Sequence, residues 1–309
     1  MSYLLVDFGA SFVKTAILSE NNISNRLEFS SPFNTSHSIE KCDLISFFDN
    51  IFGNYPDQDK VIVCCIMNGG YIKSTYYSWK SKVKHHDNVD LISGLFSDET
   101  TFHQHLDHNE QGISDLAHLG RLLNKEFYSS LADTECVRRS IDLKDGEFII
   151  NLGTGSQILS KGYTHSFIPS GRALNLYFNF FNEFGGFDMW EYLKSINYKD
   201  LLNCDITFDL NVFKEAHLFS EGGSIGQLVE GGVTKKSFFS SLLRSYIMQY
   251  VDILKTLEVN KIYLTGGISK KYPIIREFIS KQLDIEAIIV SELEEDTILG
   301  MRNAVRLYL

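Results

Sequence analysis

The sequence lacks the features that would assign the protein to a membrane, a nucleic acid or a secretory route. No apolar run approaches the about 20 residues of a membrane span, and no segment gathers Lys and Arg into a basic run. With a formal net charge of −10, the chain is expected to bind neither nucleic acid nor an anionic membrane. The first residues lack a basic stretch followed by an apolar one, so we expect no export signal.

The cysteines do not form the pattern of a disulfide framework or a zinc site. There are five, an odd number, and none belongs to a Cys-x-x-Cys pair. We therefore expect reduced thiols in a cytoplasmic protein, and no zinc. The sequence also has no low-complexity segment or linker.

A glycine-rich turn near the middle of the chain is the most informative stretch. An apolar run over 148–152 enters the turn Gly153-Thr154-Gly155-Ser156, and a second apolar run leaves it. This pattern predicts a hairpin whose glycines let the backbone approach a ligand and whose hydroxyls suit phosphate oxygens. An ordinary hairpin turn is the alternative.

The same plan occurs at the N-terminus. Residues 3–8 form an apolar run, a turn with Gly9 and Ser11 follows, and residues 12–18 form another apolar run. Two such units half a chain apart predict an internal duplication, with two half-sites that face each other.

The remaining pattern alternates strands with helices, so the fold class is α/β. With 309 residues, of which 44% are hydrophobic, the chain can fill about two domains. We expect strands over 26–29, 61–66, 261–265 and 285–290, a helical or mixed segment over 114–131, and helices over 38–52, 132–139, 175–196, 234–257, 272–283 and 297–309.

Two stretches leave alternatives open. The alternating histidines of 103–108 are expected to lie in a solvated loop, and a metal site is the alternative. The aromatic residues Phe178, Phe180, Phe181 and Phe184 are expected to pack in the core, and a wall of a sugar site is the alternative.

Four motifs in order resemble those of the actin/Hsp70/sugar-kinase superfamily, and within it the FGGY carbohydrate kinases. The first, at 7–14, resembles the phosphate-1 loop, usually D-x-G-T-T-S-x-K: Asp7, Gly9 and Lys14 match, Ser11 is conservative, and the residues at 10 and 12 differ. The other three are 151–156, which resembles phosphate-2, 264–267, which resembles the adenosine motif, and 298–304, which resembles the closing helix.

The resemblance implies a fold and its cofactors. The fold would be two ribonuclease-H-like (actin-like) domains with a nucleotide cleft between them, at 1–140 and 141–309. The cofactors would be ATP and Mg²⁺, with Asp7 holding the metal through water. The residues expected to hold the nucleotide are Gly9, Ser11, Lys14, Gly153, Thr154, Gly155, Ser156, Gly266 and Gly267.

The family places a catalytic Asp at a helix start about twenty residues before phosphate-2, and Asp133 stands at that spacing. Cys136 is similar to the cysteine that the sedoheptulokinase-like branch often has near the end of this motif. Asp133 is therefore the expected general base, which also contacts the substrate. The alternative is that its carboxylate only caps the helix.

The substrate side departs from the family. Trp79 stands at the W-x-D sugar motif, but Ser81 replaces the acid, and Asp87 is a candidate substitute. Asn68, after the buried strand at 61–66, is the other expected substrate contact. The chain is also shorter than typical members, mostly between Trp79 and Asp133.

The expected function is therefore ATP-dependent phosphorylation of a hydroxyl on a ketose, heptulose or polyol. One alternative is a nucleotide- and sugar-binding regulator without kinase activity, and another is an actin-like ATPase. The expected partner is a small sugar, and homodimerisation is an expectation from the family that no residue here marks.

Overall fold

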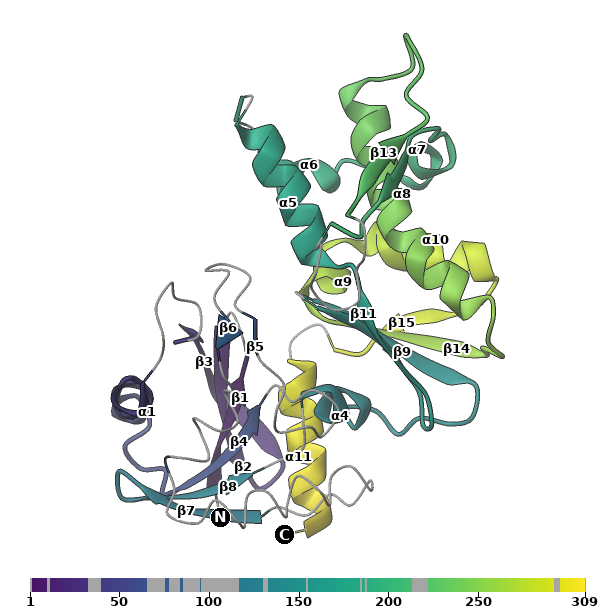
Figure 1. Cartoon of the computed structure of the whole chain (residues 1–309). Coiled ribbons are helices and arrows are strands. Elements are labelled where there is room, and N and C mark those ends of the chain that lie inside the picture. The colour runs from purple at the N-terminus through teal and green to yellow at the C-terminus, as the bar shows by residue number, and fades with distance from the viewer. Residues whose placement is uncertain are drawn as a thin grey trace. The chain divides into compact units, whose positions relative to one another are not determined.

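The structure is a computed structural model of the chain. It describes residues 2–9, 12–32, 40–65, 76–77, 84–85, 95, 117–129, 133–153, 155–183, 185–186, 188–212, 222–291 and 295–308. The chain divides into two compact units, unit 1 (residues 1–141 and 294–309) and unit 2 (residues 142–293), and each is described by itself (Figure 1).

Unit 1 is built on a six-stranded mixed sheet of order β3-β2-β1-β4-β8-β7. Strands β1, β2 and β3 form an antiparallel meander, β4 lies parallel to β1 and β8 parallel to β4, and β7 returns antiparallel to β8. The strands are β1 (Ser2–Phe8), β2 (Phe12–Ser19), β3 (Asn22–Ser30), β4 (Lys60–Cys65), β7 (Ala117–Leu122) and β8 (Lys125–Ser129). A separate two-stranded ribbon pairs β5 (Tyr76–Tyr77) with β6 (Lys84–His85).

Helices cover both faces of this sheet (Figure 1). Alternate residues of a strand face opposite sides. Leu4, Val6 and Phe8 pack against α1 (Lys41–Gly53), whereas Tyr3 and Leu5 pack against α11 (Asp296–Tyr308). The short helix α4 (Asp133–Arg138) lies beside α11 on the second face.

Unit 2 repeats the plan with a five-stranded sheet of order β11-β10-β9-β14-β15. Its first three strands are again an antiparallel meander, and β14 and β15 are parallel to β9. The strands are β9 (Glu147–Leu152), β10 (Ser156–Leu159), β11 (Thr164–Ile168), β14 (Lys261–Thr265) and β15 (Ala287–Ile289). The internal duplication predicted from the two hairpins is therefore confirmed at the level of strand order.

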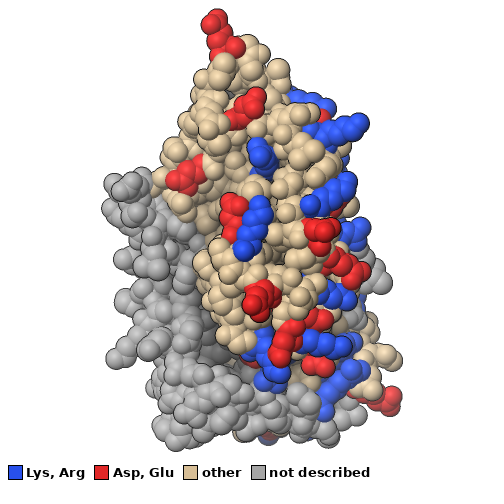
Figure 2. Space-filling model, turned by 90° about the vertical axis from the view of Figure 1, so that its right-hand side faces the viewer, with Lys and Arg blue, Asp and Glu red and all other residues tan. Residues whose placement is uncertain are grey.

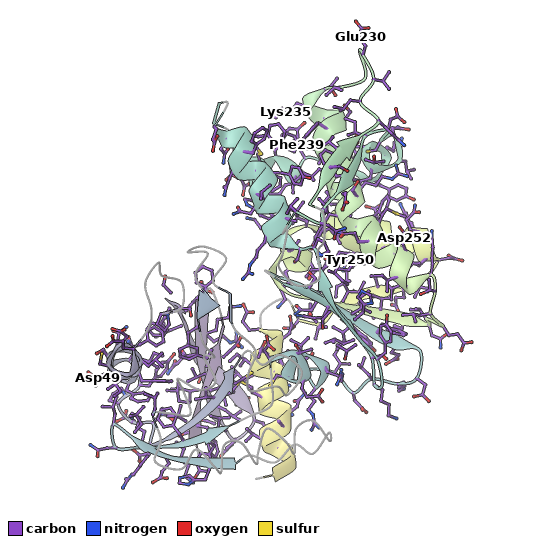
Figure 3. All side chains as sticks on the ribbon, viewed as in Figure 1. Asp49, Glu230, Lys235, Phe239, Tyr250 and Asp252 are labelled. Atoms are coloured by element: carbon purple, nitrogen blue, oxygen red, sulfur yellow. The ribbon has the colours of Figure 1, made fainter. Side chains whose placement is uncertain are left out.

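The helices of unit 2 bury a single large core that contains the interior residues of α8, among them Phe239 and Tyr250 (Figure 3). A small sheet of β12 (Thr207–Asp209) and β13 (Ser224–Gly226) joins it. The helices are α5 (Gly171–Asn182), α6 (Met189–Leu193), α7 (Tyr198–Leu202), α8 (Lys235–Leu254), α9 (Gly267–Lys271) and α10 (Pro273–Leu283).

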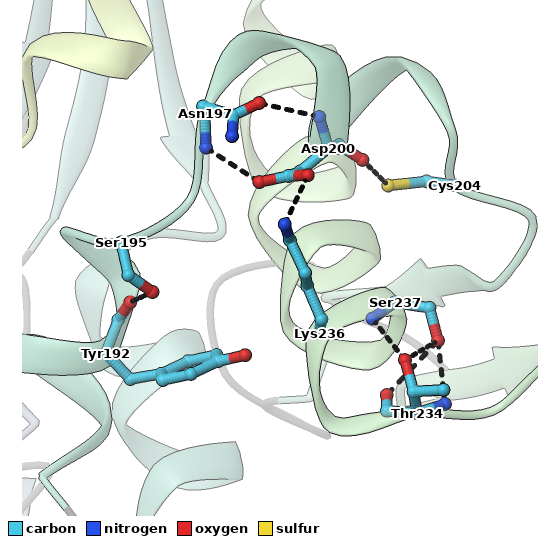
Figure 4. Close-up of polar contacts among 8 residues, drawn as sticks. All are labelled: Tyr192, Ser195, Asn197, Asp200, Cys204, Thr234, Lys236 and Ser237. Carbon is cyan, nitrogen blue, oxygen red and sulfur yellow. Dashed lines mark hydrogen bonds and ion pairs between the residues drawn. The ribbon is translucent and has the colours of Figure 1, made fainter.

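Side-chain caps fix the starts of α7 and α8 (Figure 4). Thr234 accepts a hydrogen bond from the Ser237 amide, and Asn197 accepts one from the Asp200 amide, which satisfies N–H groups that the helices leave unpaired. Lys236 forms an ion pair with Asp200 at 2.7 Å, so the two helix starts are tied to each other.

Most expected elements are present, and one expectation is wrong in part. The segment 114–131, which was expected to be helical or mixed, contains the hairpin of β7 and β8. Leu123 and Asn124 form its two-residue loop with φ of 49° and 63°, the backbone that suits the twist of a tight hairpin. The expected loop of 103–108, the Trp79 segment, Asn68 and Asp87 lie outside the described residues.

The expected boundary near residue 140 stays a prediction. The closing helix α11, which the sequence analysis grouped with residues 141–309, belongs to unit 1. Its residues Ile298, Met301, Ala304 and Val305 share a core with β1, which is the physical reason.

On the face shown in Figure 2, acidic and basic side chains are interspersed, and neither sign forms a continuous patch. Among the described residues, Lys281 forms an ion pair with Glu277 on α10. Among the described residues, none of the helices combines the length and the hydropathy that a membrane crossing needs.

Candidate functional site

The expected site residues fall into two groups, one in each unit. In unit 1, Asp7 lies near the end of β1, where it pairs in register with Lys14 of β2 and Cys64 of β4. The turn that follows is tight: Gly9 donates its N–H to the Asp7 carbonyl at 3.1 Å, and a Cβ on Gly9 would lie 2.5 Å from the Phe12 carbonyl oxygen. Only glycine fits there. Ser11 lies outside the described residues.

Asp133 is the first residue of α4 and is half-buried. Its Oδ1 accepts a hydrogen bond from the Thr134 amide at 2.6 Å and one from the Thr134 hydroxyl at 3.2 Å. Burial raises the pKa of Asp133 to about 6, although both bonds act in the opposite direction. The carboxylate therefore contacts the helix start, as the capping alternative expects, and also has the pKa of a group that can accept a proton near neutral pH.

Burial also raises the pKa of Asp7, to about 7. Lys14 lowers it, Asp133 and Glu295 raise it, and a hydrogen bond with Thr297 lowers it. Four residues therefore act on Asp7, and they come from the start of β2, the start of α4 and the region where α11 begins.

Glu295 and Thr297 belong to no motif that sequence reasoning could recognise. Lys14 donates from Nζ to Oε2 of Glu295 at 2.9 Å, so an acid within the site already balances its charge. The only sequence signal was the acidic cluster at 294–296 just before the closing helix, which has no spacing of its own that indicates a site.

Two buried thiols lie close to the carboxylates of Asp7 and Asp133. Cys64 and Cys136 are fully buried, and burial, Cys136, Asp7 and Asp133 raise the pKa of the Cys64 thiol. Cys42, Cys64, Cys136 and Cys204 are free thiols, as expected.

The carboxylates of unit 1 suit the Mg²⁺ that is expected from the resemblance to the sugar kinases. The charge of Asp133 disfavours the ionised form of Asp7 in a poorly solvated place, and a nearby cation would relieve that repulsion. Mg²⁺ keeps several water ligands and takes one or two carboxylates, and Asp7 could supply such a contact. Among the described residues, no three His, Cys, Asp or Glu side chains gather to hold a metal.

In unit 2, hydrogen bonds from buried serine hydroxyls fix the predicted phosphate-2 turn. Ser156 is 2% exposed and donates to Ser170 Oγ at 2.6 Å, and Ser170 donates to the Gly153 carbonyl at 2.5 Å. The Gly153 amide donates to the Gly155 carbonyl at 3.2 Å. The Ser156 hydroxyl is thus committed to the turn itself. Thr154 lies outside the described residues.

The predicted adenosine motif packs against that turn. Gly266 has φ of 85°, and a Cβ there would lie 2.4 Å from the Leu152 carbonyl oxygen. Asn151 donates to Gln157 at 2.8 Å and accepts from Thr265 at 3.2 Å, which ties the two loops together. Gly267 starts α9 with open space at its Cα.

Helix α5 starts at the same place and carries a row of amides. The Gly171 amide donates to the Gly153 carbonyl at 3.3 Å, and a Cβ on Gly171 would lie 2.7 Å from Ile268 of α9. Farther along α5, Asn175, Asn179 and Asn182 line a hollow of about 500 Å³ together with Trp190. Sequence reasoning missed these amides because single asparagines in a helix carry no motif.

The aromatic residues of α5 divide between core and surface. Phe178 is 2% exposed and packs edge-on against Trp190, and Phe181 packs against Phe238, so core packing is confirmed for both. Phe180 is exposed. Phe184 lies outside the described residues.

No protein-family model matches the chain, and no curated protein matches it significantly. Solved structures, in contrast, match the chain over nearly its whole length. A ligand-bound xylulose kinase from Lactobacillus acidophilus matches with a TM-score of 0.63 and 11% identity, over 99% of this chain and 90% of that one. Plasmodium falciparum glycerol kinase with ADP matches with a TM-score of 0.60 and 10% identity, over 100% and 90%.

A third match is not a kinase by its description. It is the activator of the 2-hydroxyisocaproyl-CoA dehydratase from Clostridium difficile with bound ADPNP, with a TM-score of 0.52 and 13% identity, over 98% of this chain and 92% of that one. The chain has the fold of the actin-like ATPases and sugar kinases. Because the sequence identities are only 10–13%, the similarity to these proteins is limited to the fold.

Proposed function

We propose that the protein is an ATP-dependent kinase that phosphorylates a hydroxyl of a ketose, heptulose or polyol. The observation that carries the proposal is Asp133, a carboxyl whose pKa is raised to about 6 at a helix start beside Asp7. A structural cap needs only an ionised carboxylate, whereas a general base works best with a pKa near the working pH. The sedoheptulokinase-like relationship stays part of this proposal.

The residues of unit 1 would act on the reacting groups. Asp133 would accept the proton of the attacking sugar hydroxyl. Asp7 would hold Mg²⁺ through water, and the bound metal would supply positive charge for the phosphate oxygens. The tight turn at Gly9 supports a close approach of backbone to phosphate, and Lys14 would hold Glu295 away from the transferred group.

The residues of unit 2 would bind the nucleotide. Phosphoryl transfer depends chiefly on positioning and electrostatics. A turn whose backbone is fixed by the Ser156 and Ser170 hydrogen bonds is well suited to hold a phosphate in one position. The turn at Gly153 and Gly155 would face the phosphates, and Gly266 and Gly267 would lie along the nucleoside. The amides that begin at Asn175 follow the same helix away from the turn and offer both donors and acceptors.

The test is the Asp133→Asn variant, assayed with Mg-ATP and a panel of ketoses, heptuloses and polyols, with the phosphosugar identified by mass. The wild type should form a phosphosugar, and the variant should lose turnover by about 10²–10⁴-fold. ATP affinity should be retained, because the amide keeps the shape of the carboxylate. The exposed Asp142→Asn is the matched control and should keep full turnover.

A regulator of the same fold is the second candidate, favoured by the missing acid after Trp79. It predicts ATP binding without a phosphosugar product in the wild type, and no effect of Asp133→Asn. That outcome would reject the kinase.

A further inference from the structure

The carboxylate of Asp133 is held on one of its two oxygens. Oδ1 accepts hydrogen bonds from the Thr134 amide at 2.6 Å and from the Thr134 hydroxyl at 3.2 Å. Among the described residues, no hydrogen bond or ion pair reaches Oδ2. The residue is half-buried, so part of it remains open to solvent. The carboxylate thus has one oxygen that the chain fixes and one that is left to pair with another molecule.

The two oxygens differ in how readily they accept a proton. Hydrogen bonds to an ionised carboxylate stabilise it, and each donor occupies a lone pair of Oδ1. A proton added to Oδ1 would have to displace one of the Thr134 donors, whereas a proton on Oδ2 leaves both hydrogen bonds intact. Oδ2 is therefore the oxygen on which a general base at this position would take up a proton.

Helix α4 gives this side chain a fixed support. A helix of six residues is too short to be stable on its own. Cys136 of α4 is fully buried in the same core as Met301 of α11, and Asn303 Nδ2 donates to the Arg139 carbonyl at 2.8 Å where α4 ends. With the helix held in this way, the remaining freedom of Asp133 is rotation about its side-chain bonds.

The Thr134 hydroxyl limits that rotation. Threonine is branched at Cβ, so its hydroxyl has few orientations available. One hydrogen bond would leave the carboxylate free to turn about the bonded oxygen, whereas the amide and the hydroxyl together restrict Oδ1 from two directions. Loss of the hydroxyl would therefore loosen Oδ2 without removing the carboxylate.

We propose that Thr134 is a positioning residue, whose hydroxyl holds Oδ1 of Asp133 so that Oδ2 is presented to the attacking hydroxyl of the substrate. This inference rests on the proposed kinase function. In the transfer, the substrate O–H bond breaks and its proton goes to Oδ2. The electron pair of the substrate oxygen forms the bond to the γ-phosphorus, and the bond from that phosphorus to the departing ADP breaks. Thr134 itself touches none of the reacting atoms.

The experiment compares Thr134→Val, which has nearly the same shape without the hydroxyl, with Thr134→Ser, which keeps the hydroxyl. Phosphosugar formation is measured with Mg-ATP and the same panel of ketoses, heptuloses and polyols, and calorimetry measures the dissociation constant of ATP. In Thr134→Val, kcat and kcat/KM should fall together by about tenfold, because the positioned oxygen accepts its proton only in the transition state. Thr134→Ser should restore most of kcat, and ATP affinity should be unchanged in both variants.

A double-mutant cycle shows whether Thr134 acts through Asp133. On the Asp133→Asn background the hydroxyl no longer has a base to position, so adding Thr134→Val should leave the residual turnover unchanged. A hydroxyl that served only the stability of α4 would lower turnover by the same factor on both backgrounds.

Thr256→Val is the matched control. The exposed Thr256 hydroxyl also donates one hydrogen bond, to the Ile253 carbonyl at 2.7 Å in unit 2. Its removal should change neither kcat nor KM. Urea unfolding of each variant checks that the fold is retained, and Thr134→Ala takes the place of Thr134→Val in the comparison if the valine variant is unfolded.

The outcomes separate this inference from the proposed function. If the wild type forms no phosphosugar, the kinase proposal fails and this inference fails with it. If the wild type is active and Thr134→Val keeps its kcat, the inference is overturned and the kinase stands. A higher KM with an unchanged kcat would show that the hydroxyl binds the substrate itself, which also overturns the inference, as would equal losses on both backgrounds.

Discussion

At the residue scale, the unusual chemistry belongs to two carboxyls that share a poorly solvated place. Burial raises the pKa of Asp7 to about 7 and that of Asp133 to about 6, and the charge of Asp133 adds to the rise at Asp7. Lys14 does not cancel this effect, because it is paired with Glu295. The chain thus retains an unfavourable charge arrangement at the end of β1, which is typical of functional sites.

That arrangement should make the protein less stable as the pH rises. Between pH 4 and 7 the folded Asp7 keeps a proton that the unfolded chain has lost, so stability falls across this range. Asp7→Asn should therefore stabilise unit 1 by about 1–3 kcal/mol at pH 8 and by almost nothing at pH 4. Urea unfolding at both pH values checks this. Asp49→Asn, on the exposed side of α1 (Figure 3), should have no such dependence.

Turnover should increase as the pH rises, whereas stability should decrease. A general base must be ionised to accept a proton, so kcat should rise about tenfold per pH unit below pH 6 and level off above 7. Because the two carboxyls interact, the apparent pKa belongs to the pair. A kcat that stays constant from pH 5 to 8 would contradict a role for Asp133 as the base.

At the scale of the element, sequence patterns found what local rules control. Apolar runs predicted β1, β4, β9 and β14, and helical spacing predicted α8. The hairpin of β7 and β8 was missed because its loop contains Leu123 and Asn124 at positive φ, without the glycine that signals such a turn. The pairing of β8 with the neighbouring strand β4 favours this hairpin. That strand is distant in sequence, so residues 114–131 alone do not reveal the pairing.

The crossing of α4 and α11 depends on one glycine. A Cβ on Gly300 would lie 1.6 Å from the Cys136 carbonyl oxygen, so Gly300→Ala must push the helices apart. We expect a loss of about 3 kcal/mol or more in the free energy of unfolding. Displacing α11 should also move Thr297 from Asp7 and reduce kcat.

Gly53→Ala is the control for this variant. Its Cβ would meet nothing within 4 Å, so urea unfolding should show little change. Equal unfolding midpoints for Gly300→Ala and the wild type would contradict the packing argument.

At the scale of the whole molecule, the duplication could be predicted, but the partners of the site could not. Asp7 and Asp133 could be predicted because each stands at the position of a motif of the family that the sequence resembles. Glu295 is 281 residues from Lys14 in sequence, and only folding brings the two together. The same holds for Ser170, which supports the turn from outside its motif.

Unit 1 should require residues from both ends of the chain. A variant that stops at residue 293 lacks α11, whose residues Ile298, Met301, Ala304 and Val305 share the core of β1. Hydrogen exchange should show unit 2 protected as in the full chain and unit 1 exchanging at the rate of an unfolded segment. Protection of β1 and β4 in the variant would contradict this expectation.

This arrangement has a consequence for how a cell makes the protein. A ribosome releases the chain from its first residue onward, so unit 2, which is continuous, can fold while translation is still under way. The sheet that carries Asp7 is synthesised before unit 2, whereas α11, which covers its second face, is synthesised after unit 2. During that interval the apolar side of this sheet lacks its cover, and Asp7 lacks the neighbouring Glu295 and Thr297.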